Sequence, residues 1–155
     1  MKILLILALL SVPFYSIADN ASEIDDLAKP VMELFKKKEL TNIASTALSG
    51  SSIADYISKS DMAQSDGQFE GSIKIMGKYF GSKVLHEQEV DNTFIARWYL
   101  LRFERQPVLI HMEFYKPDTK WQVHSISMDT DMDDYIKKSG TFQIGRLGSK
   151  SDKES

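Results

Sequence analysis

The apolar residues in the first part of the chain recur at helical spacing. They are Ile24, Leu27, Ala28, Val31, Leu34 and Phe35, which together form one face of a helix. Ser22 and Asp25 have the spacing of a capping box, so the pattern predicts a helix that begins at Ser22. Pro30 lies inside this helix, where it removes a backbone hydrogen bond and clashes with the preceding turn. We therefore expect a kink or a restart at Pro30.

Two more helices are predicted before residue 82. The second runs from about Glu39 to Leu48 and ends at the turn "SGSS". The next stretch, 51–67, is polar and predicts loops with one or two helical turns. The third helix extends from Gln68 to a glycine stop at Gly81. Its apolar face consists of Phe69, Ile73, Met76 and Phe80.

The second half of the chain has the composition of strands. It is rich in β-branched and aromatic residues and is broken by the turns "ERQP" and "KPDT". The predicted strands are 84–91, 93–104, 107–115 and 120–128. Three helices and then consecutive strands predict one α+β domain over residues 19–138, with N-terminal helices packed on an antiparallel sheet of four or more strands.

A two-residue turn between Glu104 and Pro107 predicts the register of the two central strands. It pairs Phe103 with Val108, Leu101 with Ile110, Tyr99 with Met112 and Arg97 with Phe114, an almost wholly apolar face. The other face carries Trp98, Leu100, Arg102, Leu109, His111, Glu113 and Tyr115. This second face is more apolar than a sheet face in water should be, which favours a homodimer through the sheet.

The first 18 residues have the features of a secretory signal peptide. Lys2 precedes the apolar run Ile3–Leu10, Pro13 comes after it, and small residues lead to cleavage near Ala18. A buried first helix is the alternative. The run is shorter than the roughly 20 residues that cross a membrane, and no cysteine is present for lipid attachment. We expect a periplasmic or secreted protein without a membrane anchor.

Composition removes several classes of function. The chain has no cysteine, which excludes disulfides, thiolate nucleophiles and sulfur-bound zinc. Its net charge of −3 makes nucleic acid an improbable partner. No cofactor motif is present, and residues 139–155 are polar and glycine-rich, which predicts a flexible C-terminal tail.

Three segments of the chain resemble exported bacterial proteins of the nuclear transport factor 2-like superfamily. They are "AKPVMELFKKKELTNIAS", "GKYFG" and "RWYLLRFERQPVLIHMEFYKPDTKWQVHSISMD", within a resemblance that covers roughly residues 22–136. The resemblance implies a cone-shaped α+β fold, in which helices cover the concave face of a curved sheet and leave a pocket. Relatives on that fold include enzymes and binding modules, so the fold does not give the function.

The predicted concave face supplies the candidate pocket residues. They are Arg97, Tyr99, Met112, Phe114 and Trp121. An arginine and a tyrosine can orient a ligand, but we expect no carboxylate on this face, and acid–base isomerisation needs one. The alternative is that Tyr99 and the aromatic residues are simply core.

Two further clusters suggest metal ligands without completing a site. Asp129, Asp131 and Asp133 begin a calcium loop, but Asp134 and Gly140 stand where glycine and glutamate are required. Capping of a short helix by Asp133 or a neighbour explains the same residues, with weak calcium binding as the alternative. The strand pairing predicted around "KPDT" also sets His111 beside His124 with Glu113 near by, on the outer face, where a surface or subunit-contact role is favoured over a metal site.

The sequence therefore predicts a non-catalytic module that binds a small apolar or amphipathic ligand or a protein partner. The alternative is a pocket enzyme of the isomerase, dehydratase or hydrolase type. That alternative requires an ionisable group inside the pocket, for which the candidates are Asp61, Asp66, Glu70 and Asp91.

Overall fold

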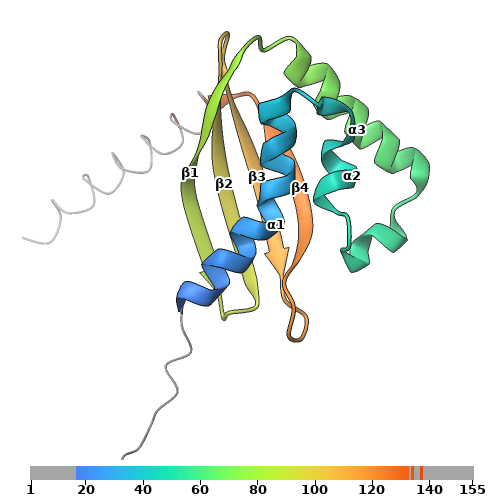
Figure 1. The fold of residues 1–155 in the computed structure, drawn as a ribbon, viewed down its shortest axis with the longest axis vertical. Helices are drawn as coiled ribbons and strands as arrows, with labels where there is room; N and C mark the ends of the chain where they lie inside the picture. Colours follow the sequence, from blue (N-terminus) through green and yellow to red (C-terminus); the bar gives the residue numbers. More distant parts are fainter. Residues whose placement is uncertain (1–16, 133, 135–136, 138–155) are drawn as a thin grey trace, which may run out of the picture.

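The computed structural model describes residues 17–132, 134 and 137, in which helices precede a single sheet (Figure 1). The helical elements are α1 (Ile17–Lys37), η1 (Leu40–Asn42), α2 (Ile43–Ala47), η2 (Ser52–Tyr56) and α3 (Lys59–Lys74). The strands are β1 (Tyr79–Val90), β2 (Phe94–Phe103), β3 (Pro107–Tyr115) and β4 (Gln122–Asp129). This order confirms the predicted α+β class. Most of the predicted signal peptide, and the predicted flexible tail 139–155, lie outside the described residues.

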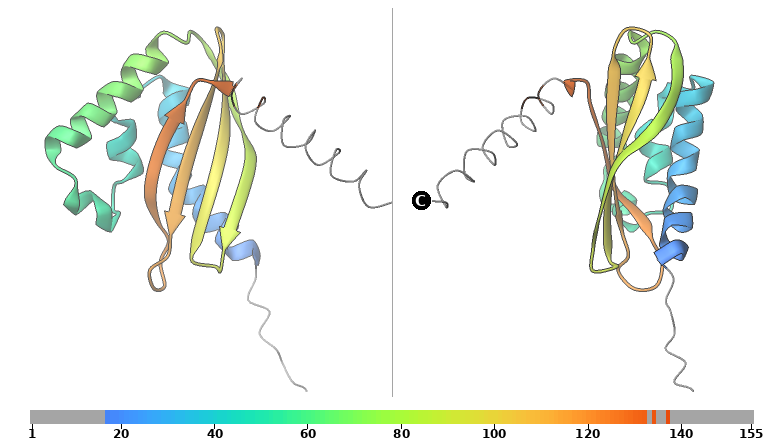
Figure 2. Two further views of the ribbon diagram at one scale, coloured as in Figure 1. Left: turned by 180° about the vertical axis from the view of Figure 1, so that it is seen from behind. Right: turned by 90° about the vertical axis from the view of Figure 1, so that its left-hand side faces the viewer.

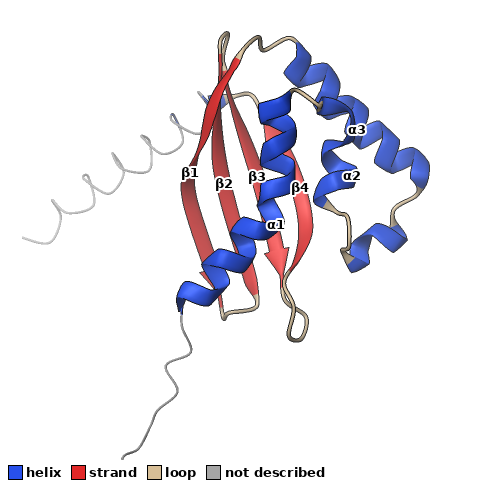
Figure 3. Cartoon of the chain, in the orientation of Figure 1, coloured by secondary structure: helices blue, strands red, loops and turns tan. Residues whose placement is uncertain are grey.

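The sheet is an antiparallel meander in the order β1-β2-β3-β4. The helices lie on one side of it, and the edge-on view in Figure 2 shows the sheet twisted, with α1 against that side. We call this the inner face. Figure 3 shows α1 crossing the strands while α2 and α3 lie beyond the β4 edge. The opposite, outer face carries no helix among the described elements.

The predicted register between β2 and β3 is wrong by two residues. Tyr99 pairs with Ile110 and Arg97 with Met112. Because side chains on a strand alternate, a shift of two leaves every residue on its predicted face. The shift arises at the end of β2, where the backbone N–H of Glu104 donates to the carbonyl of Lys78 at 2.9 Å. This bond continues the pairing of the β2 strand with the segment before β1. Glu104 is therefore not free to begin a two-residue turn, and the connection between β2 and β3 is longer.

The core lies between the helices and the inner face, and α1 and the strands supply most of it. Ile24, Val31 and Phe35 of α1 are buried there, as the helical spacing predicted. The strands contribute Leu101, Val108, Ile110, Met112 and Phe114, all fully buried. Each such side chain contributes about 1.5–3 kcal/mol on burial, so this layer accounts for much of the hydrophobic stabilisation.

The first predicted helix is right in its face and wrong in its start. α1 begins at Ile17, not Ser22, and it continues through Pro30. Figure 1 shows that α1 bends along its length without breaking into two helices. Asp25, expected to complete a capping box, instead contacts a residue of β2.

The third predicted helix is placed too late in the chain. α3 begins after Ser58, whose hydroxyl accepts a hydrogen bond from the backbone N–H of Asp61 at 3.1 Å. Gly77, with φ of +85°, turns the chain out of the helical region before β1 starts. A Cβ at Gly77 would lie 2.8 Å from Oε2 of Glu104, so a larger residue would also displace the Glu104 side chain. Phe80 therefore lies in β1 rather than in a helix.

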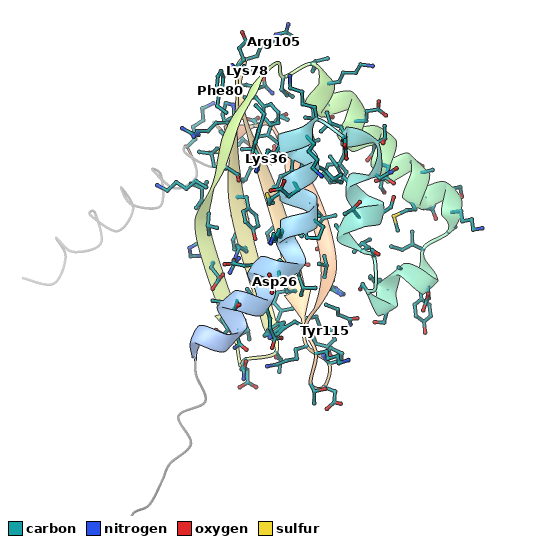
Figure 4. The ribbon with its side chains drawn as sticks, viewed as in Figure 1. Asp26, Lys36, Lys78, Phe80, Arg105 and Tyr115 are labelled. Atoms are coloured by element: carbon teal, nitrogen blue, oxygen red, sulfur yellow. The ribbon has the colours of Figure 1, made fainter. Side chains whose placement is uncertain are left out.

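The turn at Gly77 and the β2–β3 connection lie at the same end of the sheet and carry basic and aromatic side chains. Figure 4 shows Lys78, Phe80 and Arg105 there, at the opposite end from Tyr115. The Lys78 ammonium lies 5.5 Å from the centre of the Phe80 ring. Arg105 donates from Nη1 to the carbonyl of Ile75 at 2.5 Å, which ties the β2–β3 connection to the segment between α3 and β1.

A buried carboxylate joins α3 to the start of α2. Asp66 accepts hydrogen bonds from the backbone N–H groups of Ala44, at 2.7 Å, and Ser45, at 3.2 Å, and from the Ser45 hydroxyl. The first N–H groups of a helix have no partner within the helix. Asp66 supplies that partner from a distant part of the chain, so its role is structural.

We predict that Asp66→Ala lowers the free energy of unfolding by about 2–3 kcal/mol, because it leaves buried N–H groups without an acceptor. Urea unfolding measures the change. Asp55→Ala, at an exposed position in η2, is the control and should change stability by less than about 0.5 kcal/mol. Equal effects of the two substitutions would contradict the assigned role of Asp66.

Candidate functional site

The five predicted pocket residues lie in the core. Their exposed fractions are Arg97 4%, Tyr99 5%, Met112 0%, Phe114 0% and Trp121 6%. Trp121 donates from its indole nitrogen to Asn20 of α1 at 3.3 Å. The inner face at these positions is therefore packed with the protein's own side chains. A role of the five residues in binding a ligand stays a prediction.

Arg97 is the centre of a charged cluster at the border of this core. Its Nη1 donates to Oδ1 of Asp25 in α1, and its Nε donates to Oε2 of Glu87 in β1, each at 2.5 Å. Nη1 also lies 3.2 Å from the hydroxyl of Tyr99. The Arg97 side chain is 5% exposed, whereas Asp25 is 71% exposed and Glu87 is 37% exposed. A buried cation thus meets two carboxylates that remain in contact with solvent.

The prediction that this face carries no carboxylate is wrong. Glu87 reaches it because an irregularity between Val84 and His86 shifts the alternation of β1 by one residue. Asp25 reaches it because α1 crosses the sheet (Figure 1). The charge of Arg97 was visible in an otherwise apolar pattern, and a buried arginine requires an acidic partner. This requirement alone predicts that a carboxylate from another element reaches the inner face.

The cluster shifts the pKa of two groups. For Arg97, burial lowers the pKa, but the hydrogen bonds to Tyr99, Asp25 and Glu87 outweigh it, so the pKa is raised and the guanidinium stays charged. Burial raises the pKa of Tyr99, partly opposed by the hydrogen bond from Arg97. Tyr99 is thus neutral at physiological pH, and both carboxylates are engaged by Arg97. The cluster holds α1 to β1 and β2 and supplies no free base.

A cavity of about 440 Å³ lies elsewhere, between the α2–α3 region and β4. Its apolar lining residues are Ala44, Leu48, Ile53, Ile57, Met62, Phe69, Ile126 and Met128. Its polar lining residues are Ser65, Gln68, His124, Ser125 and Ser127. The lining contains no aspartate, glutamate, lysine or arginine among the described residues.

Edge strand β4 forms one wall of this cavity. Five consecutive residues, 124–128, line it. Successive side chains of a strand point to opposite faces, so a cavity that contacts five in a row runs along the strand's edge. β4 pairs only with β3, which leaves that edge without a strand partner in the described sheet. The sequence does not predict this wall, because it does not show that the α2–α3 region lies opposite the edge of β4.

None of the four proposed acidic candidates lines this cavity. Asp66 contacts the start of α2, and Asp61 accepts from the Ser58 hydroxyl at the start of α3. Glu70 and Asp91 are also absent from the lining. His124 is the titratable side chain in it.

The predicted pairing of His111 with His124 is wrong. His111 pairs with Ser127. Tyr115 pairs with Gln122, which already moves the register by two residues from the predicted one, and an irregularity between Glu113 and Phe114 adds a third residue on β4. His111 instead stacks on Trp98, with ring centres 4.4 Å apart. Its Nε2 lies 3.9 Å from Oε1 of Glu113, too far for a hydrogen bond. Within the described part of the chain, no three histidine or carboxylate side chains come together as metal ligands.

The acidic stretch after β4 serves its own backbone. Asp129 accepts from the N–H of Asp131 at 2.8 Å, and Asp131 accepts from the N–H of Asp134 at 3.3 Å. Met132 is helical, so Asp131 is in the position of a helix cap. Asp133 lies outside the described residues, and weak calcium binding by this stretch stays a prediction.

Comparison with known proteins gives a likeness of fold only. No protein-family model and no curated protein matches the sequence. The chain is similar to a solved structure described as an NTF2-like transpeptidase from Campylobacter jejuni, with a TM-score of 0.45 and 13% sequence identity. The match covers 70% of this chain and 97% of that chain. Over residues 17–132, 134 and 137, no helix is long and apolar enough to span a membrane.

We predict that Arg97→Met lowers the free energy of unfolding by about 1–2 kcal/mol. Methionine keeps the apolar stem but removes the charged hydrogen bonds, while the two exposed carboxylates regain water. Arg102→Met, on the exposed outer face of the same strand, is the control in a urea unfolding series. A loss in the control as large as that in Arg97→Met would contradict the proposed cluster.

The raised pKa of Tyr99 predicts a pH dependence of stability. The folded state holds the phenolic proton more tightly than the unfolded state, whose pKa is about 10. Stability from this group is complete below about pH 10 and is lost as the pH rises towards the folded pKa. Between about pH 9 and pH 11 the wild-type chain should therefore lose more stability than Tyr99→Phe in urea unfolding. Parallel pH profiles for the two chains would show that the shift is absent.

Proposed function

We propose that this protein is an exported, non-catalytic module that binds a small amphipathic ligand without a net charge. The observation that carries the proposal is the cavity beside β4, which we call the β4 cavity. Its volume of about 440 Å³ is within the range of about 300–1,000 Å³ typical of small-molecule sites. The predicted signal peptide supports export.

The lining supports the class of ligand. Leu48, Ile53, Ile57 and Phe69 offer an apolar wall to a hydrocarbon or aromatic body. Opposite them, His124 and Ser127 of β4 offer hydrogen bonds to a hydroxyl, carbonyl or amide group, whereas the Ser125 hydroxyl already donates to Glu113 at 2.7 Å. A full charge on the ligand would be desolvated there without an oppositely charged residue of the lining, which is unfavourable. The binding partner is therefore a molecule with one apolar and one polar end.

The same lining argues against the alternative of a pocket enzyme. General acid–base catalysis needs a group of tuned pKa, usually held in orientation by a second polar side chain. His124 has ring contacts with Phe94, at 6.4 Å, and Tyr115, at 6.1 Å, and neither supplies a carboxylate to orient it. The acidic residues that would favour catalysis lie outside the cavity lining.

A pair of matched variants tests the proposal. Gln64 and Gln68 are both exposed glutamines of α3, but only Gln68 lines the β4 cavity. We predict that Gln68→Trp weakens binding of the neutral amphipathic dye Nile red at least tenfold, because the indole fills part of the cavity. Gln64→Trp should bind as the wild type does. Fluorescence titration measures both affinities.

Two outcomes would overturn the proposal. One is equal binding by Gln68→Trp, Gln64→Trp and the wild type, which would place the dye outside the cavity. The other is no saturable binding by the wild type. Native mass spectrometry of protein purified without detergent provides a second measurement, in which a reproducible extra mass lost on denaturation identifies a ligand.

A further inference from the structure

The outer face of the sheet has an apolar hollow with a volume of about 330 Å³. It is lined by Leu85, His86, Trp98, Leu109 and Met132, and we call it the outer hollow. Trp98 lies between two imidazoles, 5.3 Å from the ring of His86 and 4.4 Å from the ring of His111. Leu85 is 45% exposed. Such an apolar site on a sheet face that no described helix covers is typical of a contact surface.

The chain itself turns towards this hollow after β4. β4 ends at Asp129, which pairs with Leu109, and three residues later Met132 lies in the lining beside Leu109 and Trp98. β4 is an edge strand, whereas Trp98 belongs to β2. The chain has therefore crossed from the edge onto the outer face within three residues. Met132 thus places the described chain on the outer face.

The C-terminal segment has the length and pattern to cover it. Residues 138–147 number ten, as many as β2, and in an extended conformation they span about 33 Å. Phe142 and Ile144 alternate with Thr141 and Gln143, which is the pattern of a strand with one apolar side. Leu147 adds a third apolar residue.

We propose that residues 140–147 dock on the outer face, with Phe142 and Ile144 packed in the outer hollow against Trp98. The docked segment is an intramolecular cover that removes Trp98 and Leu85 from water. It differs from the flexible tail that composition alone predicts, because composition contains no information on the apolar surface beside Met132. A second copy of the chain is the competing occupant of this face. The proposal concerns the side of the sheet away from the β4 cavity and is independent of the proposed ligand.

Cysteine pairing tests which occupant is present, since the natural chain has no cysteine. In the full chain, Leu85→Cys is combined with Phe142→Cys or with Ile144→Cys, and the protein is oxidised under mild conditions. A disulfide needs Cα atoms about 4.4–6.8 Å apart, so it forms only if the segment docks. Leu85→Cys combined with Ser151→Cys is the control. We expect at least one of the two test pairs to form an intramolecular disulfide at least ten times faster than the control.

Two results would overturn the proposal. If both test pairs react no faster than the control, the segment does not occupy the outer hollow. If Leu85→Cys instead forms disulfide-linked dimers and the test pairs give no intramolecular product, a second copy covers this face.

A fluorescence measurement tests the docking in a protein without introduced cysteines, which could themselves disturb folding. In a Trp121→Phe background, which leaves Trp98 as the reporter, Phe142→Ser with Ile144→Ser should raise acrylamide quenching of Trp98 at least twofold. Thr141→Ser with Gln143→Ser changes the intervening positions and should leave quenching unchanged. Equal quenching in the two double variants would contradict docking through Phe142 and Ile144.

Discussion

The apolar inner face of the sheet must be kept from water, and α1 is the helix that lies across it. The strands place Leu101, Ile110, Met112 and Phe114 on that face. α1 presents Ile24, Val31 and Phe35 to them at helical spacing. The burial of these two apolar surfaces against each other sets where the helix lies. α2 and α3 add further buried residues, among them Ile43 and Phe69, to the same core.

Arg97 limits how α1 can lie on the sheet. A cation that is 5% exposed needs an acceptor, and the Asp25 carboxylate of α1 and the Glu87 carboxylate of β1 approach it from two elements. Sliding α1 by one turn would separate Asp25 from Arg97 and leave the guanidinium with one carboxylate. The cluster therefore fixes the position of α1 on the sheet as well as stabilising the fold. Within the cluster, the charge of Arg97 is matched by the carboxylates of Asp25 and Glu87.

The β4 cavity exists because α2 and α3 extend past the last strand. Asp66 holds the start of α2 against α3, and the two helices face the free edge of β4 across the cavity. An edge strand without a strand partner offers backbone groups as well as side chains to whatever binds there. The β4 cavity thus depends on the long-range contact of Asp66 with α2 and on the order of the strands. Neither can be read from the spacing of apolar residues along the sequence.

The sequence by itself determined the order of helices and strands and the faces of α1, β2 and β3, whereas only the tertiary structure decided which distant residues meet. Helical spacing identified the buried side of α1. Alternation identified the inward residues of β2 and β3 despite a register error of two, because side-chain direction repeats every two residues. The contact of Asp25 with Arg97 spans 72 residues, and the irregularities that bring Glu87 inward and change the register of β4 on β3 depend on neighbouring strands. The physical reason is that a period is visible within a few neighbouring residues, but a long-range contact depends on how whole elements pack together.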